Sequence, residues 1–239
     1  YGQELDHEQR LRRYNEAFSL IGNSRNPPDL ILKNDDAIEI KKVDGLKSDI
    51  QLNSSPPKAY LLADDTRINR ACRELASKEG WSQKDFFYAV GSLVEGKIIR
   101  LWFVHGECYA ADHSIYETAS SRVAESIGND YSEGELGETN EIASVPNIDP
   151  LGITRLRIRG MWIIRNPSIV FGDYLDGDTE KEFKAHCVMT KKKYESYPSN
   201  LRDLIENDPR GIFSIQQVRL PNPNNPADIL DGVLLSYEV

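Results

Sequence analysis

Two apolar runs of strand length occupy the middle of this 239-residue chain, at positions 86–94 and 97–104. Only the pair Glu95-Gly96 separates them, and such a pair suits the tight turn of a β-hairpin. Near-continuous apolar runs of this length are typical of strands inside a sheet rather than at its edge. We therefore expect a β-sheet with these two strands near its centre.

Helices are expected around that sheet. Apolar residues at helical spacing predict a helix over residues 4–21 that ends at Gly22. Further helices are predicted at 65–79, 112–127 and 201–206, and further strands at 30–33, 37–43 and 153–164, with two more near the C-terminus around a loop at 221–226. A polar segment at 128–150 is expected to be a loop. This order predicts a single domain over 1–239, of the α/β class, with a mixed central β-sheet flanked by helices.

The composition favours a cytoplasmic protein. Hydrophobic residues make up 39% of the chain and charged residues 28%, with a mean hydropathy of -0.52, so no membrane association is expected. No charged-then-apolar segment follows Tyr1, so no secretion signal is expected within this sequence. Cys72, Cys108 and Cys187 are widely spaced and include no Cys-x-x-Cys pair, which argues against zinc binding and a disulfide scaffold. No organic cofactor is expected either.

The net charge of -9 argues against a nucleic-acid partner but does not exclude one. Contacts to phosphates are made by Lys and Arg, which usually leaves a DNA-binding domain basic. A nuclease that gathers carboxylates around a metal and spreads acid over its outer face can still present a basic surface to DNA. Whether the chain can bind nucleic acid therefore depends on how its Lys and Arg residues are arranged locally.

The segment 28–41 combines two acids and a lysine in a pattern that suits metal-dependent chemistry. Alternate residues of a strand share a face, so Glu39 and Lys41 point one way, while Ile38 and Ile40 are expected to point into the core. If the turn centres on Asn34, Asp29 lies across the hairpin from Glu39 on the same face. A two-residue turn at Asn34-Asp35 would instead put Asp29 out of phase.

Two facing carboxylates would meet the needs of Mg²⁺, which takes hard oxygen ligands and completes its octahedron with water and substrate phosphate. Metal binding by Asp29 and Glu39, with Lys41 beside them, would support phosphodiester hydrolysis, since the ammonium can orient the attacking water or offset phosphate charge. A surface hairpin with a solvated polar face is the competing interpretation.

Several stretches resemble a known family. The hairpin 26–43, "NPPDLILKNDDAIEIKKV", resembles the catalytic hairpin of the Pro-Asp…(Asp/Glu)-x-Lys nucleases. The stretches "FSLIGNSRNPPDL", "LNSSPPKAYL", "LWFVHGECYAA" and "DPLGITRLRIRGMW" are similar to the NgoPII-type restriction endonucleases. The resemblance implies a type II restriction enzyme that cuts double-stranded DNA at a short palindrome with Mg²⁺, a type associated with GGCC.

That resemblance assigns roles to particular residues. It makes Asp29 and Glu39 the metal ligands and Lys41 the catalytic lysine. Related nucleases often add a glutamate from the preceding helix, for which the candidates are Glu4, Glu8 and Glu16 or a residue upstream. The catalytic core is then expected at about 1–127 and the DNA-recognition elements at about 145–220.

Candidate DNA contacts come from two stretches. Arg155, Arg157 and Arg159 alternate along a predicted strand and would form one basic face, suited to guanine in the major groove, although a solvated strand face is the alternative. Phosphate contacts are also expected just after the catalytic strand, where a plain surface loop is the alternative. These candidates are Lys42, Ser54, Ser55 and Lys58. The segment "TKKKYESY" could touch the DNA backbone but more often is solvated surface.

The function that the sequence favours is a homodimeric restriction endonuclease, because a two-fold protein engages the two strands of a palindrome alike. A repair or recombination nuclease with the same hairpin is the runner-up. A non-catalytic DNA-binding module is the third interpretation.

Overall fold

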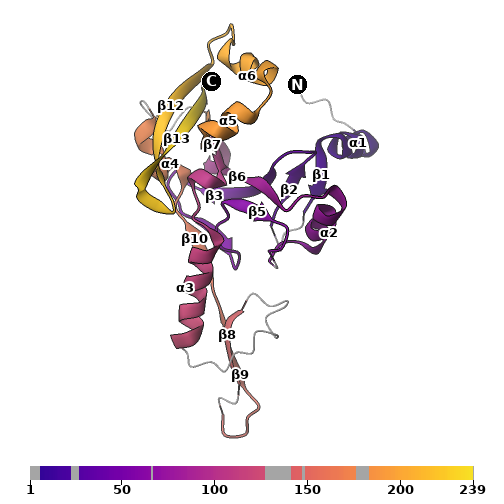
Figure 1. Ribbon diagram of the computed structural model, residues 1–239, viewed down its shortest axis with the longest axis vertical. Coiled ribbons are helices and arrows are strands. Elements are labelled where there is room, and N and C mark those ends of the chain that lie inside the picture. Colours follow the sequence, from indigo (N-terminus) through magenta and orange to yellow (C-terminus); the bar gives the residue numbers. More distant parts are fainter. Residues whose placement is uncertain are drawn as a thin grey trace.

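A long mixed β-sheet organises the protein (Figure 1). The computed structural model describes residues 6–22, 27–65, 67–126, 141–146, 149–175 and 183–238. Within them, the sheet runs in the order β1-β2-β3-β6-β7-β11-β13-β12, and β5 pairs with β6. Its strands are β1 (Phe18–Ile21), β2 (Leu30–Leu32), β3 (Ala37–Asp44), β5 (Tyr60–Leu62), β6 (Gln83–Val94), β7 (Lys97–His105), β11 (Lys184–Thr190), β12 (Phe213–Asn222) and β13 (Asn225–Glu238).

Helices and two small sheets surround it. The helices are α1 (His7–Ala17), α2 (Arg70–Glu79), α3 (His113–Ser126), α4 (Pro167–Val170), α5 (Lys191–Ser196) and α6 (Ser199–Glu206). Strand β4 (Ile50–Asn53) pairs with β10 (Trp162–Ile164), and β8 (Glu141–Pro146) pairs with β9 (Arg155–Arg159). The predicted α/β class with a mixed central sheet is confirmed. None of the described helices is both long and apolar enough to cross a membrane.

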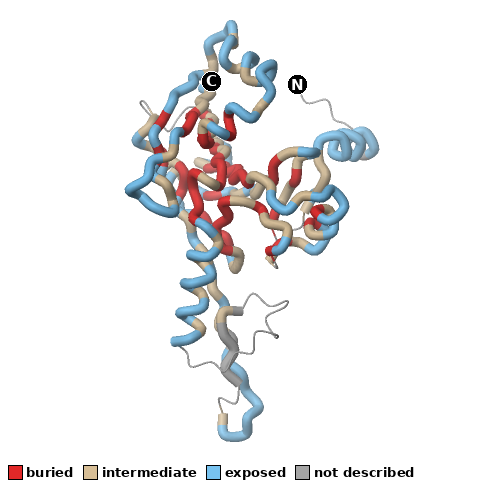
Figure 2. The backbone as a smooth tube through the Cα atoms, viewed as in Figure 1, coloured by how far each residue is buried: buried red, intermediate tan, exposed pale blue. Residues whose placement is uncertain are grey.

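The two apolar runs form the centre of the sheet, as predicted. Strands β6 and β7 are an antiparallel hairpin, and Glu95 and Gly96 both adopt positive φ in its turn, as a two-residue hairpin turn requires. Parallel strands flank the hairpin, β3 beside β6 and β11 beside β7. Trp102 and Val104 are fully buried. Figure 2 shows buried residues concentrated around these strands.

Apolar clusters cover both faces of the sheet. The larger cluster includes Phe86, Tyr88 and Val90 of β6. The smaller one, on the opposite face, includes Phe87 together with Tyr194 of α5. Successive residues of β6 thus enter different clusters, because side chains alternate across a strand. The continuous apolar run of β6 follows from this burial on both sides.

The first helix is shorter than predicted. It ends at Ala17, and Phe18–Ile21 becomes β1, which pairs antiparallel with β2. Gly22 is therefore not a helix cap. Its N–H donates to Asp29 O at 2.7 Å, and a Cβ on Gly22 would lie 2.2 Å from Pro28 O. Glycine is required here because the two backbones approach too closely for any side chain.

An arm projects from the sheet body and carries α3, β8 and β9 (Figure 1). The predicted strand at 153–164 is divided in two: β9 pairs with β8 and β10 pairs with β4. The predicted loop at 128–150 is also corrected, because 141–146 forms β8; residues 127–140 lie outside the described part. The sequence pattern missed β8 because its six residues, EIASVP, show no regular apolar alternation and follow a long polar segment.

The C-terminal third contains the predicted helix at 201–206, as α6, and the two predicted strands, β12 and β13. The expected loop at 221–226 is only a tight turn between them. The segment 190–197 forms α5, whose Lys193 and Tyr194 are buried, so it is not simply solvated surface. Thr190 caps this helix by accepting a hydrogen bond from the Lys193 N–H.

Candidate functional site

The hairpin β2–β3 has the register that brings the candidate acids to one face. Leu30 pairs with Ile38 and Ile31 with Ala37, so the turn centres on Asn34, which adopts φ 56°. The same register, continued by one residue, sets Asp29 opposite Glu39. The turn therefore centres on the residue that places Asp29 and Glu39 on the same face of the hairpin.

Short contacts hold Asp29 against β3 and join Lys41 to Glu39 within that strand. Asp29 Oδ2 accepts a hydrogen bond from the backbone N–H of Ile40 at 2.7 Å. Lys41 Nζ lies 2.7 Å from Glu39 Oε1, and the exposed fractions of these two side chains are only 19% and 12%. The structure thus brings Asp29, Glu39 and Lys41 together in a partly buried group.

One prediction about this strand is wrong. Ile40 is 51% exposed and does not point into the core. The residues of β3 that enter the larger core cluster are Ala37 and Val43, which share a face with Glu39 and Lys41. The parallel register also places Glu39 beside Tyr88 of β6. The candidate site therefore lies at the margin of the main core.

Burial dominates the electrostatics of Glu39. Its pKa is raised, first because burial penalises the charged form and also because the Asp29 carboxylate is nearby, while the Lys41 ammonium acts in the opposite direction. Glu39 Oε2 is buried and has no hydrogen-bond partner in the described part of the chain. A cation between Asp29 and Glu39 would offset the repulsion and satisfy this oxygen.

Lys58 is placed differently from the surface lysine that its loop suggested. Its ammonium is buried and forms an ion pair with Asp65, so a contact to a DNA phosphate would first require this pair to break. Burial would raise the pKa of Asp65, but the Lys58 charge and hydrogen bond lower it. The helix predicted at 65–79 therefore begins only at Arg70, where Asn69 caps α2, and Asp65 pairs with Lys58 instead.

The backbone of Lys58 is fixed against the strands that carry the site. Its N–H donates to the Tyr88 hydroxyl at 2.6 Å, and a Cβ on Gly106 would lie 2.5 Å from its carbonyl oxygen. Tyr88 in turn is the neighbour of Glu39 in the parallel register. Sequence reasoning missed this support, because an apolar run does not show which of its tyrosines will meet a distant loop.

The other candidate DNA contacts are separated from one another. Lys42 is exposed on the sheet face opposite Glu39, and Ser54 and Ser55 are half-buried in the loop after β4. Ser55 Oγ is buried without a hydrogen-bond partner in the described residues. Arg155 and Arg159 are exposed on β9 of the arm, and Arg157 occupies the alternate position between them. These positions remain predictions for DNA binding.

The donor set fits a single divalent cation with few protein ligands. No group of three or more His, Cys, Asp or Glu residues forms a metal site in the part of the chain that the structure describes. Glu8 and Glu16 are exposed on α1, and Glu4 lies outside the described residues. Asp29 and Glu39 thus supply two carboxylates. Mg²⁺ is commonly held by one or two, with the remaining positions taken by water and phosphate.

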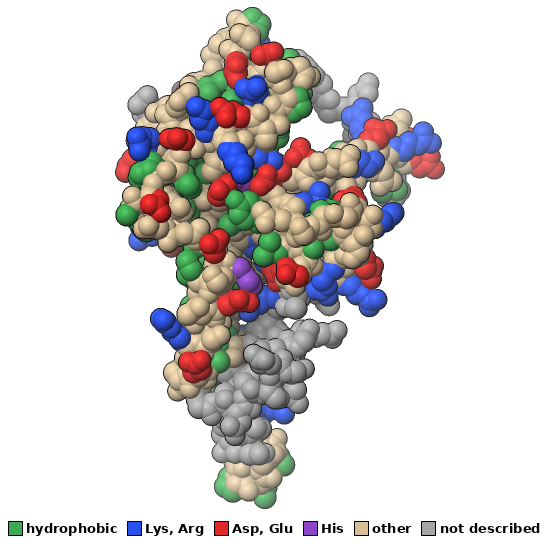
Figure 3. Space-filling view, viewed as in Figure 1, with side chains coloured by type: hydrophobic (Ala, Val, Ile, Leu, Met, Phe, Trp, Pro, Cys, Tyr) green, Lys and Arg blue, Asp and Glu red, His purple; other side chains and the backbone are tan. Residues whose placement is uncertain are grey.

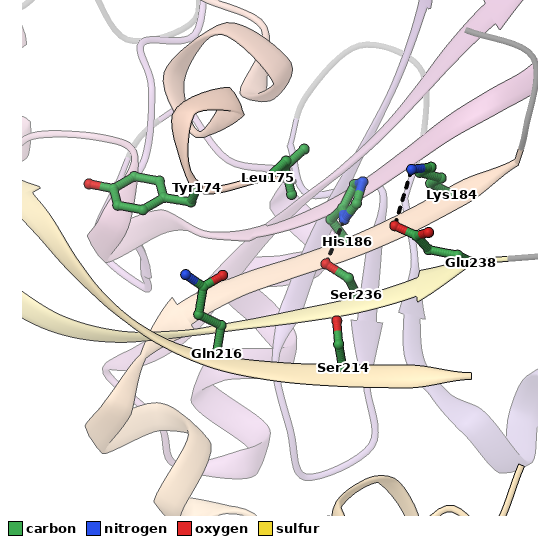
Figure 4. Close-up of a pocket in the computed structure, with 8 residues that line it drawn as sticks. All are labelled: Tyr174, Leu175, Lys184, His186, Ser214, Gln216, Ser236 and Glu238. Atoms are coloured by element: carbon green, nitrogen blue, oxygen red, sulfur yellow. Dashed lines mark hydrogen bonds and ion pairs between the residues drawn. The ribbon is translucent and has the colours of Figure 1, made fainter. Parts of the chain in front are cut away.

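Two hollows elsewhere do not include these residues. A polar pocket lies between β11, β13 and β12 (Figure 4), where His186 Nδ1 is 2.9 Å from Ser236 Oγ and Lys184 Nζ is 3.2 Å from Glu238 Oε1. An apolar hollow on the opposite sheet face from Glu39 is lined by residues that include Phe103 and Leu201. Neither hollow adds a ligand to the hairpin.

Comparison with known proteins bears on the whole chain. The family model described as NgoPII restriction endonuclease matches residues 2–221. The type II restriction enzyme NgoPII of Neisseria gonorrhoeae is 37% identical over 236 residues, which cover 98% of this chain and 83% of that protein. No solved structure gives a significant match.

Proposed function

Because the chain belongs to the NgoPII restriction endonuclease family, we propose that it hydrolyses double-stranded DNA at a short palindromic site, GGCC, in a Mg²⁺-dependent reaction. The observation that supports this most directly is the buried, unpartnered oxygen of Glu39 beside Asp29. An unsatisfied buried carboxylate oxygen is costly unless a ligand completes the site. The family match makes a divalent cation the natural ligand.

In this proposal Asp29 and Glu39 hold the cation and Lys41 acts on the reacting phosphate. The Asp29 oxygen that accepts from Ile40 N–H fixes this carboxylate against β3, and a carboxylate has further lone pairs for a cation. Bound Mg²⁺ would lower the pKa of a water and neutralise phosphate charge. Lys41, held at Glu39 Oε1, would orient the attacking water or donate to a phosphate oxygen.

The rest of the chain would serve DNA recognition and assembly. We assign the catalytic core to about residues 1–127 and expect the elements that recognise DNA to lie within about 145–220, where the arm strand β9 is the element that we assign to this role. A homodimer would match the two-fold symmetry of a palindrome. The three cysteines are unpaired, which accords with work in the reducing cytoplasm.

Digestion of a fully sequenced plasmid tests this function. Purified protein with MgCl₂ should yield discrete fragments, and sequencing their ends should place every cut at GGCC, while EDTA should prevent cutting. Cutting only of branched or damaged DNA would support the repair nuclease instead. Binding without metal-dependent cutting would support the non-catalytic module.

Base reading by the arm can be tested at Arg157, the middle arginine of β9. Arg157→Ala should weaken binding to the cognate duplex by about 1–3 kcal/mol, because a bidentate contact to guanine would be lost. Binding to a duplex without the site should change little. Arg210→Ala, an exposed arginine between α6 and β12, is the matched control in electrophoretic mobility shift titrations. An equal loss on every sequence would assign Arg157 to a phosphate instead.

A further inference from the structure

The tip of the arm exposes two large apolar side chains. Leu151 is 81% exposed and Ile153 78%, more than any other large apolar residue in the described part of the chain. Both follow β8 and precede β9. Figure 3 shows apolar side chains at the end of the projection farthest from the sheet body. Isolated exposed aliphatic residues are common, but two at the end of a projecting ribbon form a compact apolar point.

Hydrogen bonds to Asp149 shape the turn that presents these side chains. Its carboxylate accepts from the backbone N–H of Leu151 at 2.9 Å and of Thr154 at 2.7 Å, and also from the Thr154 hydroxyl. Gly152 adopts φ 68° and donates its N–H to Asp149 O at 2.9 Å. The turn is thus ordered by polar groups, and its two aliphatic side chains contribute no packing to hold it.

The charge near the tip favours a nucleic acid as the partner. The hydrogen bonds of Asp149 lower its pKa, so it is ionised, and they direct its charge onto N–H groups of the turn itself. The next residues of β9 are arginines at the alternate positions 155, 157 and 159. An apolar point beside cationic side chains complements DNA, where an apolar base stack lies between phosphates. A second copy of this chain has a net charge of -9 but does not offer an apolar base stack between regularly spaced phosphates.

We propose that Leu151 and Ile153 form a wedge that inserts between two adjacent base pairs of bound DNA. The arginines of β9 would hold the flanking phosphates or base edges, and the wedge would partly unstack one step and bend the duplex. Apolar wedges that unstack a step cost a few kcal/mol, which wider contact with the bent DNA offsets. Steps that unstack easily would then be preferred, adding selectivity at base pairs that no polar group reads. This inference rests on the proposed DNA binding but not on the catalytic residues.

Fluorescent purine analogues test the wedge in solution. Duplexes of about 30 base pairs, long enough to bend measurably, would carry the mapped cleavage site and one analogue at successive positions, with EDTA present to prevent cutting. Emission rises when such a base loses its stacking partner. We expect the unchanged protein to raise emission at one step. In longer fragments that carry the same site at different positions, it should also bend the DNA in a circular-permutation mobility assay.

The double variant Leu151→Ala/Ile153→Ala should lose both signals and bind about tenfold more weakly. The matched control is Leu204→Ala/Ile229→Ala, which truncates two exposed aliphatic residues of α6 and β13 and should behave like the unchanged protein. Tight binding with flat emission and an unbent duplex would overturn the wedge alone. The wedge would also be overturned if Leu151→Ala/Ile153→Ala lost self-association in sedimentation experiments while its binding to DNA was unaffected. Absence of any DNA binding would overturn the proposed function itself.

Discussion

Replacing Glu39 by glutamine should lower the rate of DNA cleavage by about three orders of magnitude or more, because metal-assisted charge relief is worth several kcal/mol. The amide keeps the size of the side chain but offers the cation a neutral oxygen in place of a charged one. It also removes the negative partner of Lys41 Nζ. Single-turnover cleavage of a duplex that carries the mapped site, followed over a range of MgCl₂ concentrations, measures the loss.

The control for this variant is Glu195→Gln. Glu195 is exposed on α5, which packs on the sheet face opposite Glu39, and it pairs with Lys191 at 3.8 Å. It should cleave at the unchanged rate. DNA binding and the thermal midpoint of Glu39→Gln should stay close to those of the unchanged protein. Full cleavage activity in Glu39→Gln would remove Glu39 from the site and leave the metal assignment without its main ligand.

The sequence was sufficient to predict that the candidate site residues converge, because their geometry is local. Asp29 and Glu39 are ten positions apart on two strands joined by one turn, so register alone determines whether their side chains meet. The hypothesis required a turn centred on Asn34 to bring the two carboxylates to one face, and Asn34 lies at the turn centre with positive φ. Asparagine tolerates that conformation better than most residues. The same locality allowed the hairpin β6–β7 to be predicted from its apolar runs and its Glu-Gly turn.

Features that depend on distant parts of the chain were not predictable. Nothing in the pattern of β3 shows that Ile40 is exposed, because this depends on which distant elements cover that face: Ile38 packs against the smaller apolar cluster, whereas Ile40 is exposed. The pairing of Lys58 with Asp65 likewise depends on how two loops pack. Short segments such as β8 carry weak periodic signals, so their strand structure becomes evident only with a partner strand, here β9.

A buried ion cluster around Lys193 was also not predictable from the sequence. It leads to the largest effect on stability that we expect. Lys193 Nζ lies 2.6 Å from Asp36 Oδ1 and 2.9 Å from Asp85 Oδ2, and its side chain is only 8% exposed. Tyr197 donates a hydrogen bond to Asp36 at 3.0 Å. The cluster thereby joins α5 to the start of β3, three residues before Glu39, and to β6. The sequence places Asp36 and Lys193 157 positions apart, and no local pattern connects them.

Lys193→Met should therefore lower the free energy of unfolding by about 3–5 kcal/mol, the usual cost of removing one partner from a buried ion pair. Methionine retains the length and apolar stem of the side chain, so the loss reports on charge rather than on a cavity. Urea denaturation followed by tryptophan fluorescence gives the value. Lys192→Met, an exposed neighbour on the same helix, is the control and should change stability by less than about 0.5 kcal/mol.

The pH dependence of this loss separates a charge effect from a packing effect. Burial raises the pKa of Asp36 and the His105 hydrogen bond lowers the pKa of Asp85, and the Lys193 ammonium lowers both values. Without this ammonium, the folded-state pKa of each carboxyl rises. A carboxyl with a higher pKa in the folded state contributes stability that is lost as the pH rises through that value. The stability deficit of Lys193→Met should thus be largest at neutral pH and shrink on acidification toward about pH 4.

A double variant gives a second test. Lys193→Met/Asp36→Asn should lose less unfolding free energy than the sum of the losses in the two single variants. A deficit that does not change with pH, with additive losses in the double variant, would mean that Lys193 acts through packing and not through its charge.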